Sequence, residues 1–171
     1  QATFPALFQL VAAMNPCPGS CESIQSCQCS NEQLSRYKNK LSAPLLDRID
    51  IQIELPRLPQ QQLLQQKINQ QETSAVIRQR VIQAREVQLK RQGCLNAQMS
   101  NQQIEDICVL DATSQQILSQ AIEKLKLSAR SYHRLLKLGR SIADLAGREQ
   151  ISSQCISEAI GYRRSALLQQ R

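Results

Sequence analysis

Three polar residues of the sequence stand where chemistry with a phosphate could take place. Asn15 ends an apolar run, "FQLVAAM", and open α/β sheets bind ligands at the carboxyl ends of such strands. Arg48 begins the alternating segment "RIDIQIEL", and a guanidinium can grip phosphate oxygens with two hydrogen bonds, as an arginine finger does. Arg130 lies in the first turn of a predicted helix, from which it can reach a phosphate on a neighbouring surface.

The first two residues also have simpler explanations. Asn15 precedes a proline, and the Asn-Pro dipeptide commonly starts a turn. Arg48 lies between Asp47 and Asp50, and the three can form a surface charge cluster of little energetic value. Taken alone, both positions favour these structural explanations over chemistry.

The segment 128–147 predicts the most clearly amphipathic helix of the chain. Arg130, Arg134 and Lys137 fall on the side opposite its apolar face. That polar side is typical of a solvated surface, and a phosphate contact through Arg130 is the alternative. The predicted apolar face comprises Tyr132, Leu135, Leu136, Leu138, Gly139, Ile142, Ala143, Leu145 and Ala146. The only histidine, His133, is predicted to be a surface residue rather than a catalytic base.

Four cysteines, Cys17, Cys21, Cys27 and Cys29, lie in one proline- and glycine-containing loop as C-x₃-C-x₅-C-x-C. Four thiolates can bind structural Zn²⁺ in a tetrahedron, and reduced loop thiols are the alternative. The other three cysteines, Cys94, Cys108 and Cys155, are predicted to be small packing residues. Seven unevenly spaced cysteines argue against a secreted disulfide framework and predict a reducing, cytoplasmic location.

The net charge of +7 is unevenly distributed along the 171 residues. Residues 1–56 carry four basic and five acidic side chains, a sum of −1, whereas 57–171 carry 17 basic and nine acidic ones, a sum of +8. A polyanion, either nucleic acid or a nucleotide phosphate, is therefore a natural partner of the second part, with a solvated basic surface as the alternative. The candidate DNA-backbone contacts are Arg78, Arg80, Arg85, Lys90 and Arg91.

The pattern of elements predicts an α/β fold followed by an all-α one. A buried strand over 8–14 and a half-buried strand over 49–55 flank a short helix that begins near Ser30. Aromatic residues make up only 3% of the chain, so its core must be aliphatic, which favours helical packing. The predicted helices of the second part span 74–92, 100–107, 111–126, 128–147 and 153–161, with caps at Asn101, Asp111, Ser128 and Ser153 and ends at Gly93 and Gly147.

The chain is predicted to consist of an α/β part over 1–57, a linker over 58–73, a helical domain over 74–165 and a tail over 166–171. Prolines and a glutamine-rich run mark the linker. No stretch reaches the roughly 18 apolar residues of a membrane span, and the opening residues do not form a signal peptide. Neither a membrane nor secretion is therefore expected.

In combination, three segments resemble the C-terminal part of the ComM/YifB family of magnesium-chelatase-like AAA+ ATPases. These segments are "FPALFQLVAAMNPCP", "LSAPLLDRIDIQIELPRL" and "LSARSYHRLLKLGRSIADLAG" followed by "AIGYRR". The resemblance covers essentially the whole chain, in the family's order. It implies the end of a P-loop core and a helical lid, within a hexameric ring that threads DNA and drives branch migration during natural transformation.

The resemblance assigns a role to each of the three polar residues. It implies that Asn15 is the sensor-1 residue that helps to orient the attacking water. Arg48, in "LLDRID", matches the arginine finger that reaches the nucleotide of the adjacent subunit, and Arg130, in "LSAR", matches the sensor-2 arginine of the lid. The family carries a similar cysteine-rich insertion, with the second cysteine displaced by two residues here.

Two motifs of such motors are missing from the sequence. No G-x-x-x-x-G-K-[ST] occurs and no apolar run ends in Asp-Glu, so these residues alone can neither cradle the phosphates of ATP nor hold Mg²⁺. The chain is therefore expected to be a fragment that is inactive by itself. Two other functions remain open: a non-enzymatic nucleic-acid-binding module that uses the basic second part, and the motor subunit of a magnesium chelatase.

Overall fold

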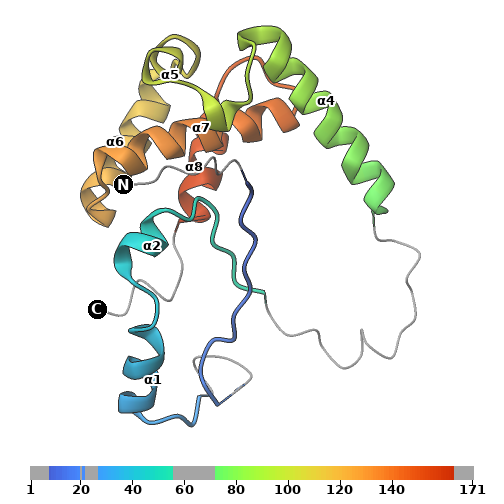
Figure 1. Cartoon of the computed structure of the whole chain (residues 1–171). Helices are drawn as coiled ribbons and strands as arrows, with labels where there is room; N and C mark the ends of the chain where they lie inside the picture. The colour runs from blue at the N-terminus through green and yellow to red at the C-terminus, as the bar shows by residue number, and fades with distance from the viewer. Residues whose placement is uncertain (1–7, 20, 22–26, 56–71, 164–171) are drawn as a thin grey trace, which may run out of the picture. The chain divides into compact units, whose positions relative to one another are not determined.

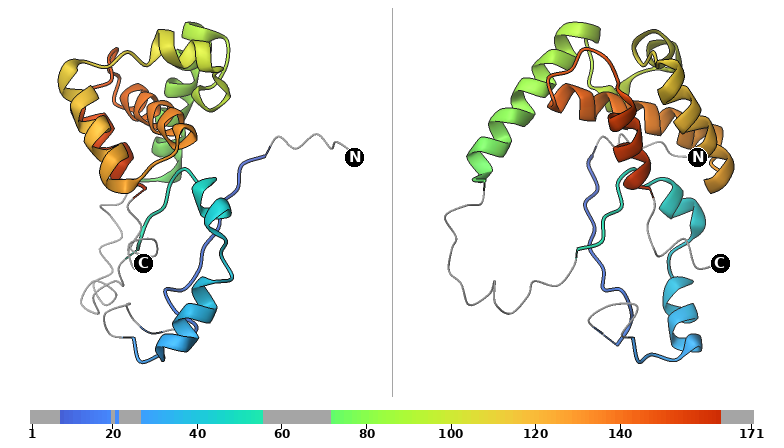
Figure 2. Two further views of the ribbon diagram at one scale, coloured as in Figure 1. Left: turned by 90° about the vertical axis from the view of Figure 1, so that its left-hand side faces the viewer. Right: turned by 180° about the vertical axis from the view of Figure 1, so that it is seen from behind.

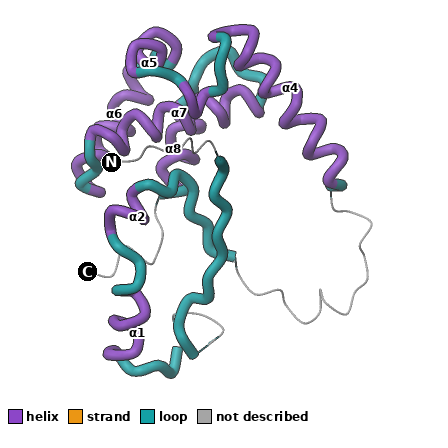
Figure 3. The backbone as a smooth tube through the Cα atoms, in the orientation of Figure 1, coloured by secondary structure: helices purple, strands orange, loops and turns teal. Residues whose placement is uncertain are grey.

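The computed structural model describes residues 8–19, 21, 27–55 and 72–163. The chain divides into two compact units, Gln1–Ser42 and Ala43–Arg171. All the regular elements of the described ranges are helices, as Figures 1 and 3 show, and an isolated parallel bridge between Leu110 and Ile151 is their one β-type pairing. Most of the predicted linker over 58–73 and the whole predicted tail lie outside these ranges, so the predicted domain limits stay a prediction.

Within the described part of the first unit, α1 (Asn31–Lys38) is the one helix. It begins with a capping box: the Ser30 Oγ accepts the backbone N–H of Gln33 at 3.2 Å, and the Gln33 side chain accepts the Ser30 N–H at 3.0 Å. These two bonds satisfy donors that the first turn of a helix leaves without intrahelical partners. The Tyr37 hydroxyl then donates to the carbonyl oxygen of Asn15 at 2.9 Å, which ties the loop to the helix.

Neither predicted strand is present among the described residues. Residues 8–14 are irregular and exposed; Val11, for example, is 85% exposed. Residues 50–55 make one backbone hydrogen bond within the described ranges, from the Gln52 N–H to the Tyr162 carbonyl at 2.8 Å. A strand needs a ladder of such bonds to a neighbouring strand, and the described ranges offer no such neighbour. An apolar pattern alone therefore does not make either segment a strand.

A short helix, α2 (Ala43–Asp47), directly precedes Arg48. Pro44 is the second residue of this helix. Proline is tolerated in the first turn because the N–H that it lacks would have no intrahelical partner there. The proline therefore helps to start a helix that leads directly to Arg48.

The second unit is built from α2 and a group of larger helices whose bounds agree with the predicted spans to within two residues. These are α4 (Ser74–Gln92), α5 (Asn101–Ile107), α6 (Ala112–Leu125), α7 (Ala129–Leu145) and α8 (Ser153–Gly161), with a 3₁₀ turn, η2 (Asn96–Gln98). α7 packs against α4, η2, α5 and α8, and α6 packs against α8. Figure 2 shows the N-terminal half of α4 projecting from the other helices of this unit.

None of the described helices combines the length and apolar character needed to cross a bilayer.

The core of this unit is aliphatic, as the composition predicts. Its buried members are Met99, Ile104, Cys108, Leu118, Ala121, Leu135, Leu136, Ala143, Ile151, Cys155, Ile156, Ala159 and Ile160. The predicted apolar face of α7 is buried through its middle, but Leu145 at its end is 45% exposed. α7 and α8 approach closely at Gly139, where a Cβ would lie 3.1 Å from the Ile156 Cδ1.

The helix ends follow the local signals with two small corrections. Asp111 and Ser128 cap α6 and α7 as predicted, accepting backbone N–H groups at 2.7 and 3.2 Å. The caps of α5 and α8 are Ser100 and Ser152, one residue earlier than predicted in each case, because the preceding serine is the residue with extended backbone geometry. The predicted ends at Gly93 and Gly147 are confirmed by positive φ angles of 74° and 65°, which glycine adopts without strain.

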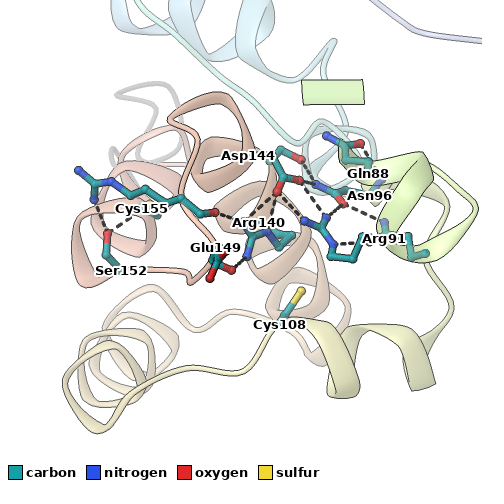
Figure 4. A network of polar contacts seen from close by, with 12 residues as sticks. Gln88, Arg91, Asn96, Cys108, Arg140, Asp144, Glu149, Ser152 and Cys155 are labelled. Carbon is teal, nitrogen blue, oxygen red and sulfur yellow. Dashed lines mark hydrogen bonds and ion pairs between the residues drawn. The ribbon is translucent and has the colours of Figure 1, made fainter. Parts of the chain in front are cut away.

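A buried carboxylate joins α4 to α7, as Figure 4 shows. The Asp144 side chain has no exposed surface and lies 2.8 Å from the Arg140 guanidinium, itself only 2% exposed. Arg91 donates to both oxygens of Asp144 at 2.7 and 3.0 Å, and the Asn96 amide donates to it at 2.8 Å. The Arg140 Nη1 and Nη2 also donate to the Glu149 and Arg148 carbonyls in the loop after α7, at 2.7 and 2.6 Å. Each charge that leaves water here therefore has several partners.

The network also sets the charge state of Asp144. Burial alone would raise the pKa of this carboxyl, but the hydrogen bonds from Arg91 and Asn96 and the charges of Arg140 and Arg91 outweigh it, so the pKa lies below its usual value. A carboxylate with a lowered pKa stabilises the fold above its unfolded-state pKa of about 3.9, and this contribution is lost as the pH falls through the folded-state value.

We expect Asp144→Ala to lower the free energy of unfolding by about 3–5 kcal/mol at pH 7, because Arg140 would remain buried without its main partner. Urea unfolding followed by circular dichroism measures this loss. The matched control is Asp106→Ala, which removes an exposed carboxylate and should change stability by no more than about 0.5 kcal/mol. The difference between wild type and Asp144→Ala should shrink as the pH is lowered below about 4; equal losses from both variants would contradict a structural role for the network.

Candidate functional site

Arg48 lies in the turn that follows α2 and is exposed. Its Nη1 donates to the Pro44 carbonyl at 2.8 Å, and its backbone N–H donates to the Leu45 carbonyl at 3.0 Å. Both contacts lie within α2 and its own turn, and no acidic side chain of the described ranges pairs with Arg48. The guanidinium therefore keeps most of its five donors for a ligand or another chain.

The two aspartates beside Arg48 do not form the surface cluster that the sequence left open. The Asp47 carboxylate accepts the Ser131 hydroxyl at 2.8 Å and the Arg163 guanidinium at 2.9 Å. Asp50 pairs with Arg134 at 3.0 Å. Asp47 thus docks the turn onto α7 and the residues after α8, and Asp50 contacts α7, which leaves Arg48 as the unpaired charge of the turn.

Arg130 lies in the first turn of α7, which Ser128 caps. It is exposed and has no hydrogen-bond or ion-pair partner among the described residues. The other two cations of the predicted polar face are used by the chain itself: Arg134 pairs with Asp50, and Lys137 donates to the Ala97 carbonyl at 3.1 Å. Of the three, Arg130 alone is available for an anion.

Asn15 belongs to the first unit and its side chain is exposed, directly before the cysteine loop. Its backbone carbonyl is held by the Tyr37 hydroxyl. Arg48 and Arg130 belong to the second unit, where Ser131, the residue after Arg130, is hydrogen-bonded to the residue before Arg48. The hydrogen bond between Ser131 and Asp47 therefore places the sequence neighbours of Arg130 and Arg48 in direct contact.

The four cysteines of the loop lie together, with all their sulfur atoms within 4.8 Å of one another. The Cys21 and Cys29 sulfurs are 4.0 Å apart, and the cysteines are free thiols. Four sulfurs at about 2.3 Å from a tetrahedral Zn²⁺ would lie about 3.8 Å from one another. The donor set and its spacing therefore fit a metal of this kind with small adjustments.

The backbone of the loop is shaped around the thiols. A Cβ at Gly19 would lie 2.7 Å from the Cys29 sulfur and 3.5 Å from that of Cys21, so a side chain there would push the cluster apart. The backbone N–H of Cys21 donates to the Cys17 sulfur at 3.3 Å and lowers the pKa of Cys17 to about 7, whereas burial raises the pKa of Cys29 to about 12. Hydrogen bonds from backbone N–H groups to sulfur favour the thiolate that binds a metal.

The remaining cysteines fit the predicted packing role. Cys108 and Cys155 are buried in the helical core and Cys94 is packed against it. Burial raises the pKa of Cys108 to about 11, as expected for a thiol without a chemical role.

Two residues that hold the Arg48 turn, Ser131 and Arg163, were not identified from the sequence. They lie 84 and 116 residues from Asp47 in sequence, so no local spacing signals the contact. The only available sign was the pair of aspartates beside Arg48, which need cationic partners if they are not fully solvated.

Comparisons with known proteins agree along almost the whole chain. The sequence model of the family described as "Magnesium chelatase, subunit ChlI C-terminal" matches residues 71–163, and that described as "Magnesium chelatase, subunit ChlI" matches residues 1–63. The chain is 46% identical over 168 residues to the competence protein ComM of Haemophilus influenzae; the aligned segment makes up 98% of this chain and 33% of that protein. It is 43% identical over 161 residues to YifB of Escherichia coli, and this aligned segment makes up 94% of this chain and 32% of that protein. The chain thus spans about a third of the length of these curated relatives.

Proposed function

The chain belongs to the magnesium chelatase subunit ChlI family, and from this premise we propose that it is the C-terminal part of a cytoplasmic AAA+ motor that couples ATP hydrolysis to DNA remodelling. The observation that carries the proposal is the pair of exposed arginines on the second unit, Arg48 and Arg130, whose neighbouring residues are hydrogen-bonded to each other. The similarity to a competence protein favours DNA as the substrate of the motor.

In the proposed mechanism the three polar residues divide the work of phosphoryl transfer. Arg48 acts as the arginine finger, placing positive charge beside the phosphoryl group that is being transferred on an adjacent subunit. Arg130 binds nucleotide phosphate from the first turn of α7, whose dipole also favours an anion. Asn15 helps to orient the attacking water as sensor 1.

The 171 residues do not contain the phosphate-binding loop or the acidic pair for Mg²⁺. In the proposed motor, residues outside this sequence bind ATP and Mg²⁺, and the subunits form a ring, most simply a hexamer, in which each Arg48 faces a neighbour. We assign residues 1–57 to the end of an α/β core, 58–73 to a linker, 74–165 to a lid and 166–171 to a tail. The two family matches, which part between residues 63 and 71, support this division.

We expect Arg48→Ala, in the complete gene product that includes these 171 residues, to reduce kcat for ATP hydrolysis by about 10³-fold, because the transition-state charge loses its partner. ATP affinity, measured with a fluorescent nucleotide, should stay within about twofold, because a finger acts on the transition state rather than on bound ATP. Arg36→Ala, which removes an exposed arginine of α1, should leave kcat unchanged. Hydrolysis that persists in the Arg48 variant would refute the finger.

The cysteine cluster supports a second component of the proposal, a structural Zn²⁺ that holds the loop next to Asn15. Metal analysis of the purified chain should find about one zinc per molecule. Cys29→Ser should remove it, and Gly19→Ala should weaken its retention against a chelator because the added Cβ crowds the Cys29 sulfur. Cys94→Ser, outside the cluster, is the matched control and should retain the metal. A wild-type chain without zinc after expression in zinc-supplemented medium would contradict the site.

A second candidate function, DNA binding without catalysis, is favoured by the basic second part. Two of the five candidate cations of α4 are used within the chain, since Arg80 pairs with Glu72 and Arg91 pairs with Asp144. Arg78, Arg85 and Lys90 are exposed and have no partner among the described residues.

These three cations should make DNA binding steeply dependent on salt. Replacing all three with alanine should weaken the binding of the 171-residue chain and reduce its salt slope by about 3, at roughly 0.9 per phosphate contact. Fluorescence anisotropy with duplex DNA between low and moderate salt measures both, and Lys124→Ala on α6 is the control. Absence of binding at low salt would remove this candidate, and ATPase activity of the complete protein that DNA does not stimulate would favour a chelatase motor subunit instead.

A further inference from the structure

Among the described residues, the Asp47 carboxylate makes the shortest side-chain contacts between the Arg48 turn and the rest of the second unit. It accepts the Ser131 hydroxyl at 2.8 Å and the Arg163 Nη2 at 2.9 Å. The side chain of Asp47 is 41% exposed, but both partners are buried, with Ser131 1% exposed and the Arg163 side chain 7% exposed. The carboxylate is therefore held by two donors whose side chains are themselves buried.

The backbone of Asp47 is held as well. Its carbonyl oxygen accepts Arg134 at 3.2 Å and Arg163 at 3.3 Å. Further along the chain, the Gln52 N–H donates to the Tyr162 carbonyl at 2.8 Å. The turn is thus docked on two elements at once, the first half of α7 and the residues that follow α8.

Arg48 itself contributes nothing to this docking. Its side chain reaches back to the Pro44 carbonyl, which belongs to the same short helix, so that bond does not fix α2 relative to α7. Asp50 contacts α7 through Arg134, but its side chain is 55% exposed, and solvent weakens such a pair. The position of Arg48 relative to α7 therefore depends mainly on Asp47.

The other end of the contact lies next to Arg130. Ser131 follows Arg130, its N–H bonds to the capping Ser128 hydroxyl at 3.2 Å, and the two hydroxyls are 3.1 Å apart. A single carboxylate thus connects the turn that carries Arg48 to the capped first turn that carries Arg130.

We propose that Asp47 is a positioning residue that locks the Arg48 turn to the first turn of α7, so that Arg48 and Arg130 are presented by one rigid surface. This inference rests on the proposed function, because it concerns where the finger is held. A guanidinium must lie within hydrogen-bonding distance of the developing charge, and a misplacement of about 1 Å can cost about 10²-fold in rate.

The test compares ATP hydrolysis by variants of the complete gene product. Asp47→Ala and Ser131→Ala should each lower kcat by about 10-fold or more while the KM for ATP stays within about twofold, because the finger is displaced and the nucleotide cradle is not. Asp47→Asn keeps an acceptor for Ser131 and loses the charge pair with Arg163, so its kcat should lie between those of wild type and Asp47→Ala. Glu54→Gln is the control from the segment that follows the turn: Glu54 is exposed and has no partner among the described residues, so kcat should stay within about twofold of wild type.

Two further measurements separate positioning from a general loss of stability. In the double variant Asp47→Ala/Ser131→Ala, kcat should fall no further than in the more affected single variant, because both changes break the same contact. Trypsin cleavage after Arg48, followed by mass spectrometry, should accelerate in the Asp47 variants relative to cleavage after Arg36, which lies in the other unit. A variant that is merely less stable would show cleavage at both sites rising together and an unchanged kcat below its unfolding temperature.

The outcomes distinguish the lock from the finger. If Arg48→Ala abolishes hydrolysis but Asp47→Asn, Asp47→Ala and Ser131→Ala retain wild-type kcat, the lock is refuted and the proposed function stands. If Arg48→Ala retains hydrolysis, the proposed function is refuted, and an unchanged cleavage rate after Arg48 in the Asp47 variants refutes the lock as well. Should Asp47→Ala fail to fold, Asp47→Asn and Ser131→Ala decide between these outcomes, since each removes only one of the two partners.

Discussion

The buried carboxylate of Asp144 is the interaction on which the arrangement of the second unit depends. A carboxylate without exposed surface is tolerable only where its charge is compensated and its oxygens accept hydrogen bonds. Arg140 meets this need from the same helix, whereas Arg91 and Asn96 meet it from α4 and the 3₁₀ turn that follows. These bonds require one relative position of α4 and α7, because each donor must lie within hydrogen-bonding distance of the same carboxylate. The network therefore fixes α4 against the C-terminal half of α7.

The opposite end of the same helix holds the candidate chemistry. Seventeen residues of α7 connect the Asp144 network to the capped turn with Arg130, and a helix of that length transmits position because its backbone bonds leave little freedom. At this N-terminal end the donors are buried and the carboxylate is partly exposed. The buried Ser131 hydroxyl and the largely buried Arg163 guanidinium donate to Asp47 in the Arg48 turn. One helix thus relates the projecting basic α4 at one end to both exposed arginines at the other. In the motor proposed above, movement of α4 as a body would carry these arginines with it, which is the coupling that the proposed function requires.

The parts of this arrangement that are local in sequence could be predicted, and those that depend on distant partners could not. Serine or aspartate before a periodic segment and glycine after it mark helix ends because the groups that they satisfy lie within four residues. The four thiols were identifiable as a candidate site because they share one short loop. By contrast, no local pattern indicates that Arg140 and Asp144 are buried, because one partner of Asp144, Arg91 on α4, lies 53 residues earlier in the sequence. Asp47 was likewise grouped with its neighbour Arg48, although its partners lie on α7 and beyond α8.

The two predicted strands also depend on a distant partner that a sequence pattern does not reveal. Ile51, Ile53 and Leu55 alternate as a half-buried strand requires, yet they are 50%, 65% and 81% exposed, and residues 8–14 are exposed as well. Alternation describes which side chains would be buried once a neighbouring strand exists; it does not provide the neighbour. Contiguous exposed apolar side chains are typical of surfaces that pack against other polypeptide, and the α/β core of the proposed motor would supply such a surface. Because Asp47 already holds the start of the 49–55 segment to α7, a sheet that captured this segment would fix the Arg48 turn from both sides.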